Sequence, residues 1–339
     1  MKVAKRLTQL ILTLTILLTL TSCIVVVDRG YYYENGQYYK SGNFDFNSYQ
    51  IDEIDISWPY GSVVINTNSD SNYGYIRDNS TSSLESEKLH YLLDGRKLYI
   101  KYCASGYSPL AYSEKKTLYV TLPSTLLSNM KIATTYASVL ATASNFDSLN
   151  IKSNSGYISL NNIILKNNLL VSTQSGQIDL KNSTVISKTL LNTSYGKITI
   201  DNLKGQNLEI ESSSGSIGLS NLGLYNNLQI NSSSSSIEIN NSFFNSGNID
   251  TKSGSSKLIA SSFKSFDYKS ESASLTLDGI PSFNLYFNTM SGKLYSPSSI
   301  YSDGNGFYIY PAGSNPTTVI SAKTKSGSIY FKPWLVKLS

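Results

Sequence analysis

The feature that most constrains this chain is a serine-rich phrase that returns at a nearly fixed interval. It reads IKSNSGYISL from residue 151, VSTQSGQIDL from 171, IESSSGSIGL from 210 and AKTKSGSIYF from 322. The apolar residue that opens each copy, five positions before the glycine, marks its register. Successive marks are 19 or 20 residues apart, at Ile132, Ile151, Val171, Leu191, Ile210, Ile230, Ile249, Tyr268 and Phe287, with further copies at Ile56 and Ala322. Such a period indicates stacked repeats.

Each copy also carries the alternation of a β-strand. Seven and nine positions after the mark the residue is usually apolar, as at Ile158 and Leu160. Residues two apart on a strand point to the same face, and stacking buries a face that one copy cannot bury alone. The sequence therefore predicts an all-β fold, a single-domain parallel β-solenoid (a β-helix) with coils of 19 to 20 residues.

The glycine of the phrase is expected to turn a corner in every coil. We expect it to adopt dihedral angles that other residues resist, while neighbouring Ser, Thr and Asn side chains bond nearby backbone groups. Ala137, Ser235 and Ala273 replace the glycine in three copies. The predicted repeat-turn glycines are Gly61, Gly156, Gly176, Gly196, Gly215, Gly254, Gly292 and Gly327.

The first residues read as an export signal. A cationic segment with Lys2, Lys5 and Arg6 precedes an apolar stretch that is short for a membrane span. The stretch ends in Leu-Thr-Ser-Cys at Cys23, which resembles the lipobox of bacterial lipoproteins. The resemblance implies cleavage before Cys23 and attachment of acyl chains, which would anchor the protein to a membrane. The alternatives are a signal in which Cys23 is incidental and an uncleaved anchor helix.

The cysteine content argues against a disulfide-bonded framework, and the charge content argues against a nucleic-acid-binding protein. The chain has only Cys23 and Cys103, so a lipidated Cys23 leaves Cys103 without a partner for an intramolecular disulfide. We interpret Cys103 as a structural residue. Removing the three cations of the signal lowers the formal charge from +5 to +2. That charge is too small for an electrostatic nucleic-acid footprint, so we expect no nucleic-acid partner.

The repeat pattern divides the chain. The segment after the signal is rich in Tyr and turn formers, so we interpret it as a tether. We expect the copy at Ile56 to supply the first coil, and the final copy with KPWLVKLS to close the far end. The predicted segments are a signal peptide (1–22), a lipidated Tyr-rich tether (23–45), the solenoid (46–333) and a C-terminal tail (334–339). Within the solenoid we expect an insertion with a hairpin (66–131), regular coils (132–299) and a second insertion (300–320).

A set of motifs in a fixed order carries a family resemblance. ISWPYGSVVI at 56, LDGRKLYI at 93 and LYVTLPS at 118 precede the repeats, and GNGFYIY at 304 and KTKSGSIYF at 323 follow them. This order resembles the bacterial putative-adhesin family, which is of otherwise unknown function and related to auto-transporter adhesin-like head domains. The resemblance covers about residues 45 to 333. It implies a parallel, right-handed β-solenoid that is often lipid-anchored, and it implies no known ligand.

Residues for catalysis or metal binding are scarce. His90 is the only histidine, so neither a two-histidine metal motif nor an identifiable catalytic triad is present. Asp179 and Glu238 share one repeat position but are three coils apart, too far for paired-carboxylate chemistry. Aspartates at fixed offsets, as in calcium-binding repeats, are absent from the sequence. We expect no catalytic residues, no metal and no cofactor.

Tyrosine is the best candidate for contact with a partner, because it offers a large contact area at low entropic cost. The chain has 26 tyrosines, and five crowd the predicted tether: Tyr31, Tyr32, Tyr33, Tyr38 and Tyr39. The alternative is that tyrosine simply favours strands and lipid headgroups.

The functional hypothesis is an exported, non-catalytic protein, lipid-anchored in the cell envelope, on the periplasmic or the outer side. It would present a binding surface, as an adhesin or an envelope interaction protein, to a glycan, matrix or envelope-protein ligand. One alternative is a structural or stress-linked envelope component without an external ligand. A second alternative is a carbohydrate-active β-helix enzyme. The sequence leaves the ligand and the oligomeric state open.

Overall fold

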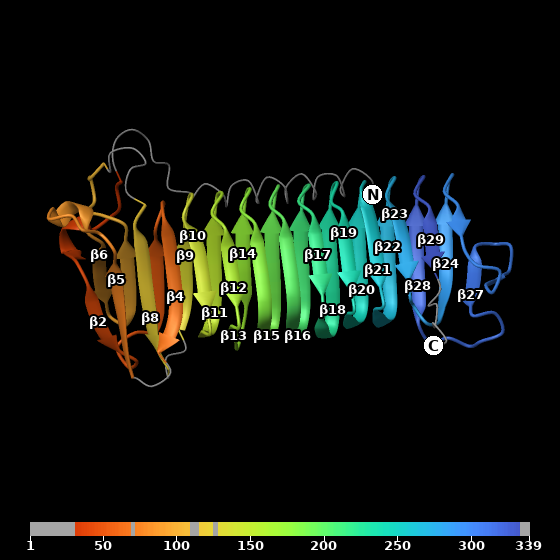
Figure 1. Cartoon of the computed structure of the whole chain (residues 1–339), viewed down its shortest axis with the longest axis horizontal. Helices are drawn as coiled ribbons and strands as arrows, with labels where there is room; N and C mark the ends of the chain where they lie inside the picture. Colours follow the sequence, from red (N-terminus) through yellow and green to blue (C-terminus); the bar gives the residue numbers. More distant parts are fainter. Residues whose placement is uncertain (1–30, 69–71, 109–114, 125–127, 333–339) are drawn as a thin grey trace, which may run out of the picture.

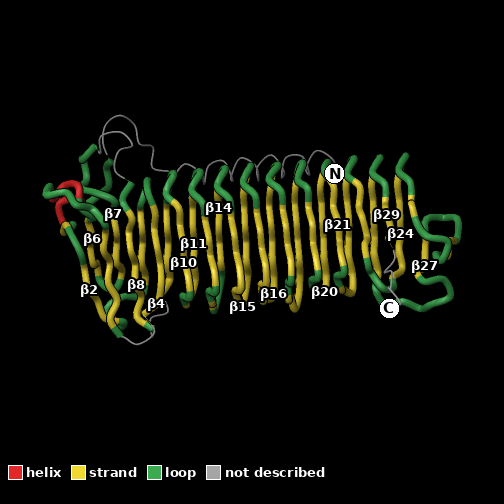
Figure 2. The backbone as a smooth tube through the Cα atoms, viewed as in Figure 1, coloured by secondary structure: helices red, strands yellow, loops and turns green. Residues whose placement is uncertain are grey.

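The computed structural model describes residues 31–68, 72–108, 115–124 and 128–332, and these residues form an elongated all-β structure (Figure 1). Strands are almost the only regular elements (Figure 2), beside two 3-10 turns, η2 (Gly36–Tyr38) and η3 (Glu85–Glu87). Most strand pairs are parallel, and all strands belong to one large sheet. The predicted all-β class is confirmed, whereas residues 1–22, Cys23 and residues 334–339 lie outside the described part.

The strands stack in two long columns. Column A follows the order β1 (Lys40–Ser41), β6 (His90–Asp94), β7 (Lys97–Lys101), β3 (Glu53–Ser57), β9 (Ser128–Ala133), β11 (Asn145–Ser153), β14 (Leu169–Thr173), β15 (Ile178–Thr193), β16 (Ile198–Ser212), β18 (Gly223–Ser232), β20 (Phe243–Thr251), β22 (Ser262–Ser270), β28 (Val319–Thr324), β24 (Phe283–Thr289), β27 (Phe307–Tyr310) and β26 (Tyr301–Ser302). The first two and last two pairings are antiparallel, and the others are parallel.

Column B runs alongside. Its order is β2 (Phe44–Asn47), β5 (Tyr73–Asp78), β8 (Thr117–Pro123), β4 (Ser62–Asn68), β10 (Ser138–Thr142), β12 (Ile158–Asn161), β15, β16, β17 (Ile217–Ser220), β19 (Ile237–Asn240), β21 (Ser255–Ile259), β23 (Ser274–Asp278), β29 (Ile329–Lys332) and β25 (Leu294–Tyr295). A narrower third side contains β13 (Ile164–Leu165) and the adjoining parts of β15, β16, β18, β20 and β22.

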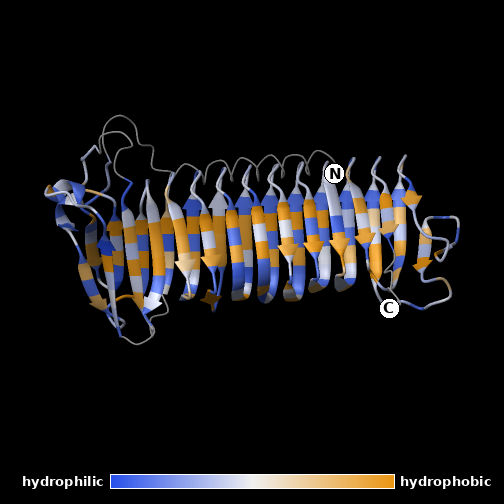
Figure 3. Ribbon diagram, viewed as in Figure 1, coloured by the Kyte–Doolittle hydropathy of each residue, from blue (hydrophilic) through white to orange (hydrophobic). Residues whose placement is uncertain are grey.

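Matched register builds the core. Ile158 pairs with Ile178, and Ile178 pairs with Ile198, so residues at the same repeat position lie on neighbouring strands. All three side chains are fully buried. Apolar and polar residues alternate along the strands (Figure 3), which directs one set inward and the other outward. Stacking therefore joins the short apolar runs of single repeats into one continuous interior.

The spatial order departs from the chain order at the N-terminal end. Strands β3 and β4 lie between β7 and β8 on one side and β9 and β10 on the other. The sequence led us to expect that the copy at Ile56 is the first in the stack. That expectation is wrong, because β7 and β8 lie outside this copy. The segment 66–131, assigned to an insertion, supplies β7 and β8, which stack in parallel register with the repeats.

The C-terminal end shows the same arrangement. The final copy, β28 and β29, inserts between β22 and β23 on one side and β24 and β25 on the other. The expectation that this copy closes the end is wrong. In column A the end is covered by antiparallel strands: β27 (Figure 1) pairs with the edge that β24 would otherwise expose, and β26 pairs with β27.

The predicted tether is folded from Tyr31 onward. Tyr31 is buried, and its hydroxyl donates to the carbonyl of Ser57 at 3.0 Å. Strands β1 and β2 pair antiparallel with β6 and β5 and so cover both N-terminal edges. Open strand edges favour pairing with further strands, which gives this Tyr-rich segment a structural role.

The repeat glycines are required for space rather than for unusual dihedral angles. Only Gly61 and Gly254 among the eight have a positive φ. A Cβ on Gly196 would overlap the carbonyl oxygen of Gly176, the equivalent residue on the preceding repeat. This corrects the expectation from the sequence, because the backbone of one corner lies directly against the next. Left-handed φ angles occur instead at a second corner, in Ala143, Asn162, Asn182, Asn202, Asn221, Asn241 and Ala260.

A hydroxyl side chain accepts a bond from the glycine at several of these corners. The N–H of Gly196 donates to Oγ1 of Thr193 at 2.8 Å, and Gly176 bonds Thr173 in the same way at 2.9 Å. Thr193 and Thr173 are buried, so these bonds satisfy backbone groups that water cannot reach. This explains why Ser or Thr precedes the glycine by three positions in most repeats, although Trp58 precedes Gly61.

We predict that Gly196→Ala destabilises the stack by about 1–3 kcal/mol, because its methyl group must displace the neighbouring backbone. Gly218→Ala is the matched control, since a Cβ there meets nothing within 4 Å. Thermal and urea unfolding of both variants measures the difference. Equal midpoints for Gly196→Ala and the native chain would contradict the close-stacking explanation.

Candidate binding surface

The third side of the stack carries an outward-facing row of register partners. Its members, in order, are Ile164, Thr184, Lys204, Gly223, Phe243 and Ser262, one from each successive strand. The side chains of Ile164 and Phe243 are 49% and 47% exposed. Apolar groups thus remain in contact with water on this side. Apolar, hydroxyl and cationic side chains lie next to one another in the row.

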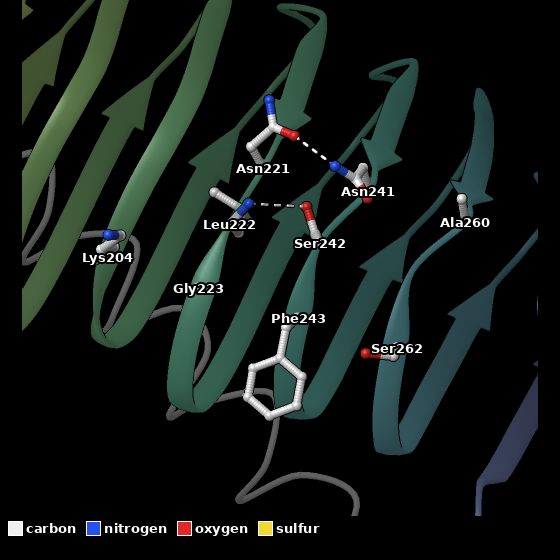
Figure 4. Close-up of a pocket in the computed structure, with 9 residues that line it drawn as sticks. All are labelled: Lys204, Asn221, Leu222, Gly223, Asn241, Ser242, Phe243, Ala260 and Ser262. Carbon is white, nitrogen blue, oxygen red and sulfur yellow. Dashed lines mark hydrogen bonds between the residues drawn. The ribbon is translucent and has the colours of Figure 1, made fainter.

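An open groove interrupts this row (Figure 4). It has a volume of about 310 Å³ and is lined by Lys204, Asn221, Leu222, Gly223, Asn241, Ser242, Phe243, Ala260 and Ser262. Gly223 lies between Lys204 and Phe243 in the row, and a Cβ placed on it would meet only Cγ of Lys204, at 3.8 Å. A side chain at position 223 would therefore fill part of the groove.

Amide groups form one rim of the groove. Nδ2 of Asn241 donates to Oδ1 of Asn221 at 2.7 Å, and Nδ2 of Asn221 donates to Asp201 at 2.7 Å. Ala260 occupies the next position along this corner, so the ladder of amides ends at Asn241. The ladder holds both amides in place and leaves Oδ1 of Asn241 outside it, at the edge of the groove.

A cation and an aromatic ring lie on either side of Gly223. Lys204 is exposed, and within the described part of the chain it forms no ion pair. Phe243 is exposed although phenylalanine is usually buried. The groove thus combines one positive charge, one apolar ring and fixed amides, a combination typical of a small polar-ligand site.

Of the five predicted contact tyrosines, two are exposed and three pack against other parts of the protein. Tyr32 and Tyr38 are 66% and 65% exposed and are free to face a partner. Tyr31 is buried, which excludes it as a contact residue. Tyr33 and Tyr39 meet edge to face, with ring centroids 4.8 Å apart, and burial raises the pKa of Tyr39 to about 12. The sequence could not separate the two groups, because all five lie in one short segment.

The remaining predicted residues lie apart from the groove. Cys103 is buried, and burial raises its pKa to about 12, so its thiol stays protonated near neutral pH. Asp179 accepts a hydrogen bond from the hydroxyl of Tyr157 at 2.6 Å. Thr199 and Gly218 separate Asp179 from Glu238 in the strand register, so these two acids do not come together. The described residues contain no cluster of three or more metal-ligating side chains.

The sequence did not reveal a buried cation in the N-terminal cap, as we call the part of the stack formed by the described residues up to 124. Lys116 is only 4% exposed, and its Nζ lies 4.1 Å from the ring centroid of Tyr102 and 5.2 Å from that of Trp58. Asp78 lies 3.5 Å from the same nitrogen. These partners come from distant parts of the chain, so no local pattern indicates them. The carboxylate of Asp78 and the two aromatic rings balance the charge of Lys116, and these contacts join distant segments of the cap.

The cap is also predicted to weaken in mild acid. His90 is buried, and burial lowers its pKa, so the folded chain resists a proton that the unfolded chain accepts near pH 6.5. The stability contributed by neutral His90 is therefore complete above that pH and is lost as the pH falls below it. Thermal unfolding between pH 7.5 and 5.5 should show a steeper loss for the native chain than for His90→Gln. The same slope in both would contradict this assignment.

Comparisons with solved structures find two similar proteins. A crystal structure of a putative cell adhesion protein from Clostridium sporogenes ATCC 15579 is 11% identical, over 87% of this chain and 99% of that one, with a TM-score of 0.23. A crystal structure of a putative adhesin from Bacteroides fragilis NCTC 9343 is 10% identical, over 85% of this chain and 95% of that one, with a TM-score of 0.35. No curated protein matches the chain.

None of the helices in the described residues has the length and apolar character needed to cross a membrane. The family model described as Toastrack DUF4097 matches residues 51–279, which confirms the resemblance noted from the ordered motifs. Because this match covers more than half of the sequence, the chain belongs to the toastrack DUF4097 family.

Proposed function

We propose that this protein is an exported, lipid-anchored β-solenoid with right-handed coils that acts as an adhesin-like binding protein of the bacterial cell envelope. The observation that carries the proposal is the open groove between Lys204 and Phe243. An exposed aromatic ring beside an open space keeps apolar surface in water that folding does not bury. Such a feature is explained when a ligand covers the ring.

The length of the stack supports a role in presentation. The described residues of column A form sixteen strands, and strands about 4.8 Å apart give a column of about 70 Å. Tyr31, the first described residue, packs at the end that contains β1 and β6, beside Ser57. Strand β20, which carries Phe243, is the eleventh in the column and lies about 50 Å from β1. With the stack upright on the membrane, an anchor on Cys23 would leave the groove well away from the membrane surface.

The proposed activity is binding without catalysis. The carboxylates of Asp179 and Glu238 do not meet, and His90 is buried in the cap. Exposed aromatic side chains also occur at the far end, where the rings of Tyr295 and Tyr330 stack 4.8 Å apart. These side chains provide a second region suited to contact with a partner.

The lipid anchor is tested by Cys23→Ser. We expect the native chain to incorporate a palmitate analogue and to sediment with membranes, and the variant to lose both properties, because serine lacks the thiol that accepts the lipid. Cys103→Ser is the control and should change neither, since its thiol is buried. Lipid incorporation that survives in Cys23→Ser would contradict the assignment.

Surface presentation is tested by protease treatment of intact and lysed cells. Digestion of the chain in intact cells is the expected result for an adhesin, because the stack would stand outside the outermost layer. Digestion only after lysis would contradict adhesion to an outside partner and favour an envelope component that acts beneath that layer. A trypsin-sensitive loop tag serves as the control for protease resistance of the stack itself.

A further inference from the structure

We propose that the groove binds an acidic sugar, specifically a pyranose ring that carries a carboxylate within a glycan. This inference rests on the proposed binding function and names the class of ligand. It depends on three features of the groove, namely its width, its chemistry and the identity of residue 223 (Figure 4).

The width of the groove suits one saturated ring. Lys204, Gly223 and Phe243 are register partners on three successive strands, so Lys204 and Phe243 stand about 9.6 Å apart at the backbone. A saturated ring that contacts Phe243 on one side and a lysine stem on the other needs about 8 Å, since carbon contacts are about 4 Å each. One sugar ring therefore fits above Gly223, between the two side chains.

The chemistry of the walls matches an acidic sugar. The face of the Phe243 ring attracts the polarised C–H groups on the flat side of a pyranose. Oδ1 of Asn241, which the amide ladder leaves outside, can accept a hydrogen bond from a sugar hydroxyl. Lys204 lacks a carboxylate partner among the described residues, and a carboxylate on the ligand would supply one. A nucleic acid would need more positive charge than one lysine provides.

Gly223 points to a ligand because the backbone does not require it. Its φ angle is not left-handed, and a Cβ would make only an ordinary contact with Lys204. Gly205, in the neighbouring repeat, differs, since a Cβ there would overlap the carbonyl oxygen of Val185. Glycine weakens a strand, and Gly223, unlike the equally open Gly218, leaves space beside an exposed cation and an exposed aromatic ring.

The deciding variant is Gly223→Val in the full chain, solubilised in detergent. Valine favours a strand and fills the groove, so we expect an unchanged or higher unfolding temperature together with at least tenfold weaker binding of trigalacturonic acid. Binding is measured by isothermal titration calorimetry, with maltotriose as the neutral probe. Gly218→Val is the matched control, because that glycine is equally open but lies on column B. It should leave binding unchanged.

Two further variants test the walls. Phe243→Ala should weaken binding of both sugars at least tenfold, and Lys204→Gln should remove the preference for trigalacturonic acid over maltotriose. Native affinity for the acidic sugar should fall as salt rises, as expected for a partly exposed ion pair.

The outcomes separate the two proposals. Binding that persists in Gly223→Val, or a preference for the acidic sugar that persists in Lys204→Gln, would overturn the groove assignment while leaving an adhesin-like function standing. Failure of the native chain to bind trigalacturonic acid would also overturn the assignment. The broader function would fail separately, if the native chain bound no member of a panel of glycans, matrix proteins and envelope proteins.

Discussion

Hydrogen bonding between parallel strands in matched register is the constraint on which the rest of this structure depends. Because each repeat presents the same positions to its neighbours, Ile158, Ile178 and Ile198 fall into one buried row. The same matching brings corner backbones so close that a Cβ at Gly196 would overlap Gly176. It also places like side chains next to one another outside, where like charges would repel and amides or hydroxyls can bond. A charged content of only 15% fits this constraint.

Both ends of the stack are covered by antiparallel strands. A parallel column leaves unpaired strand edges, and antiparallel strands cover the edges of column A at each end. At both ends a copy that is outermost in sequence lies one place inward in space, held between two neighbours. The regular middle is thereby enclosed, and its third side is left to carry the groove.

The candidate site illustrates what a repeat can provide. Each repeat contributes one residue to the outward row, so chemistry changes from strand to strand while the backbone stays the same. Lys204, Gly223 and Phe243 are three consecutive members of that row, about 20 residues apart in sequence. No short motif contains them, which is why sequence reasoning directed attention to the tyrosines of one segment instead. The groove becomes visible once the register of the third side is known.

The sequence by itself determined the all-β class, the repeat period and the inward apolar positions, because all three depend on the spacing of residues along the chain. Only the tertiary structure decided the order of the end repeats, the burial of Tyr31 and Lys116, the reason for the corner glycines and the position of the groove. These features depend on which strands become neighbours across long stretches of chain. Spacing within a copy specifies which face is buried, whereas contacts between copies decide where edges are covered and where space remains.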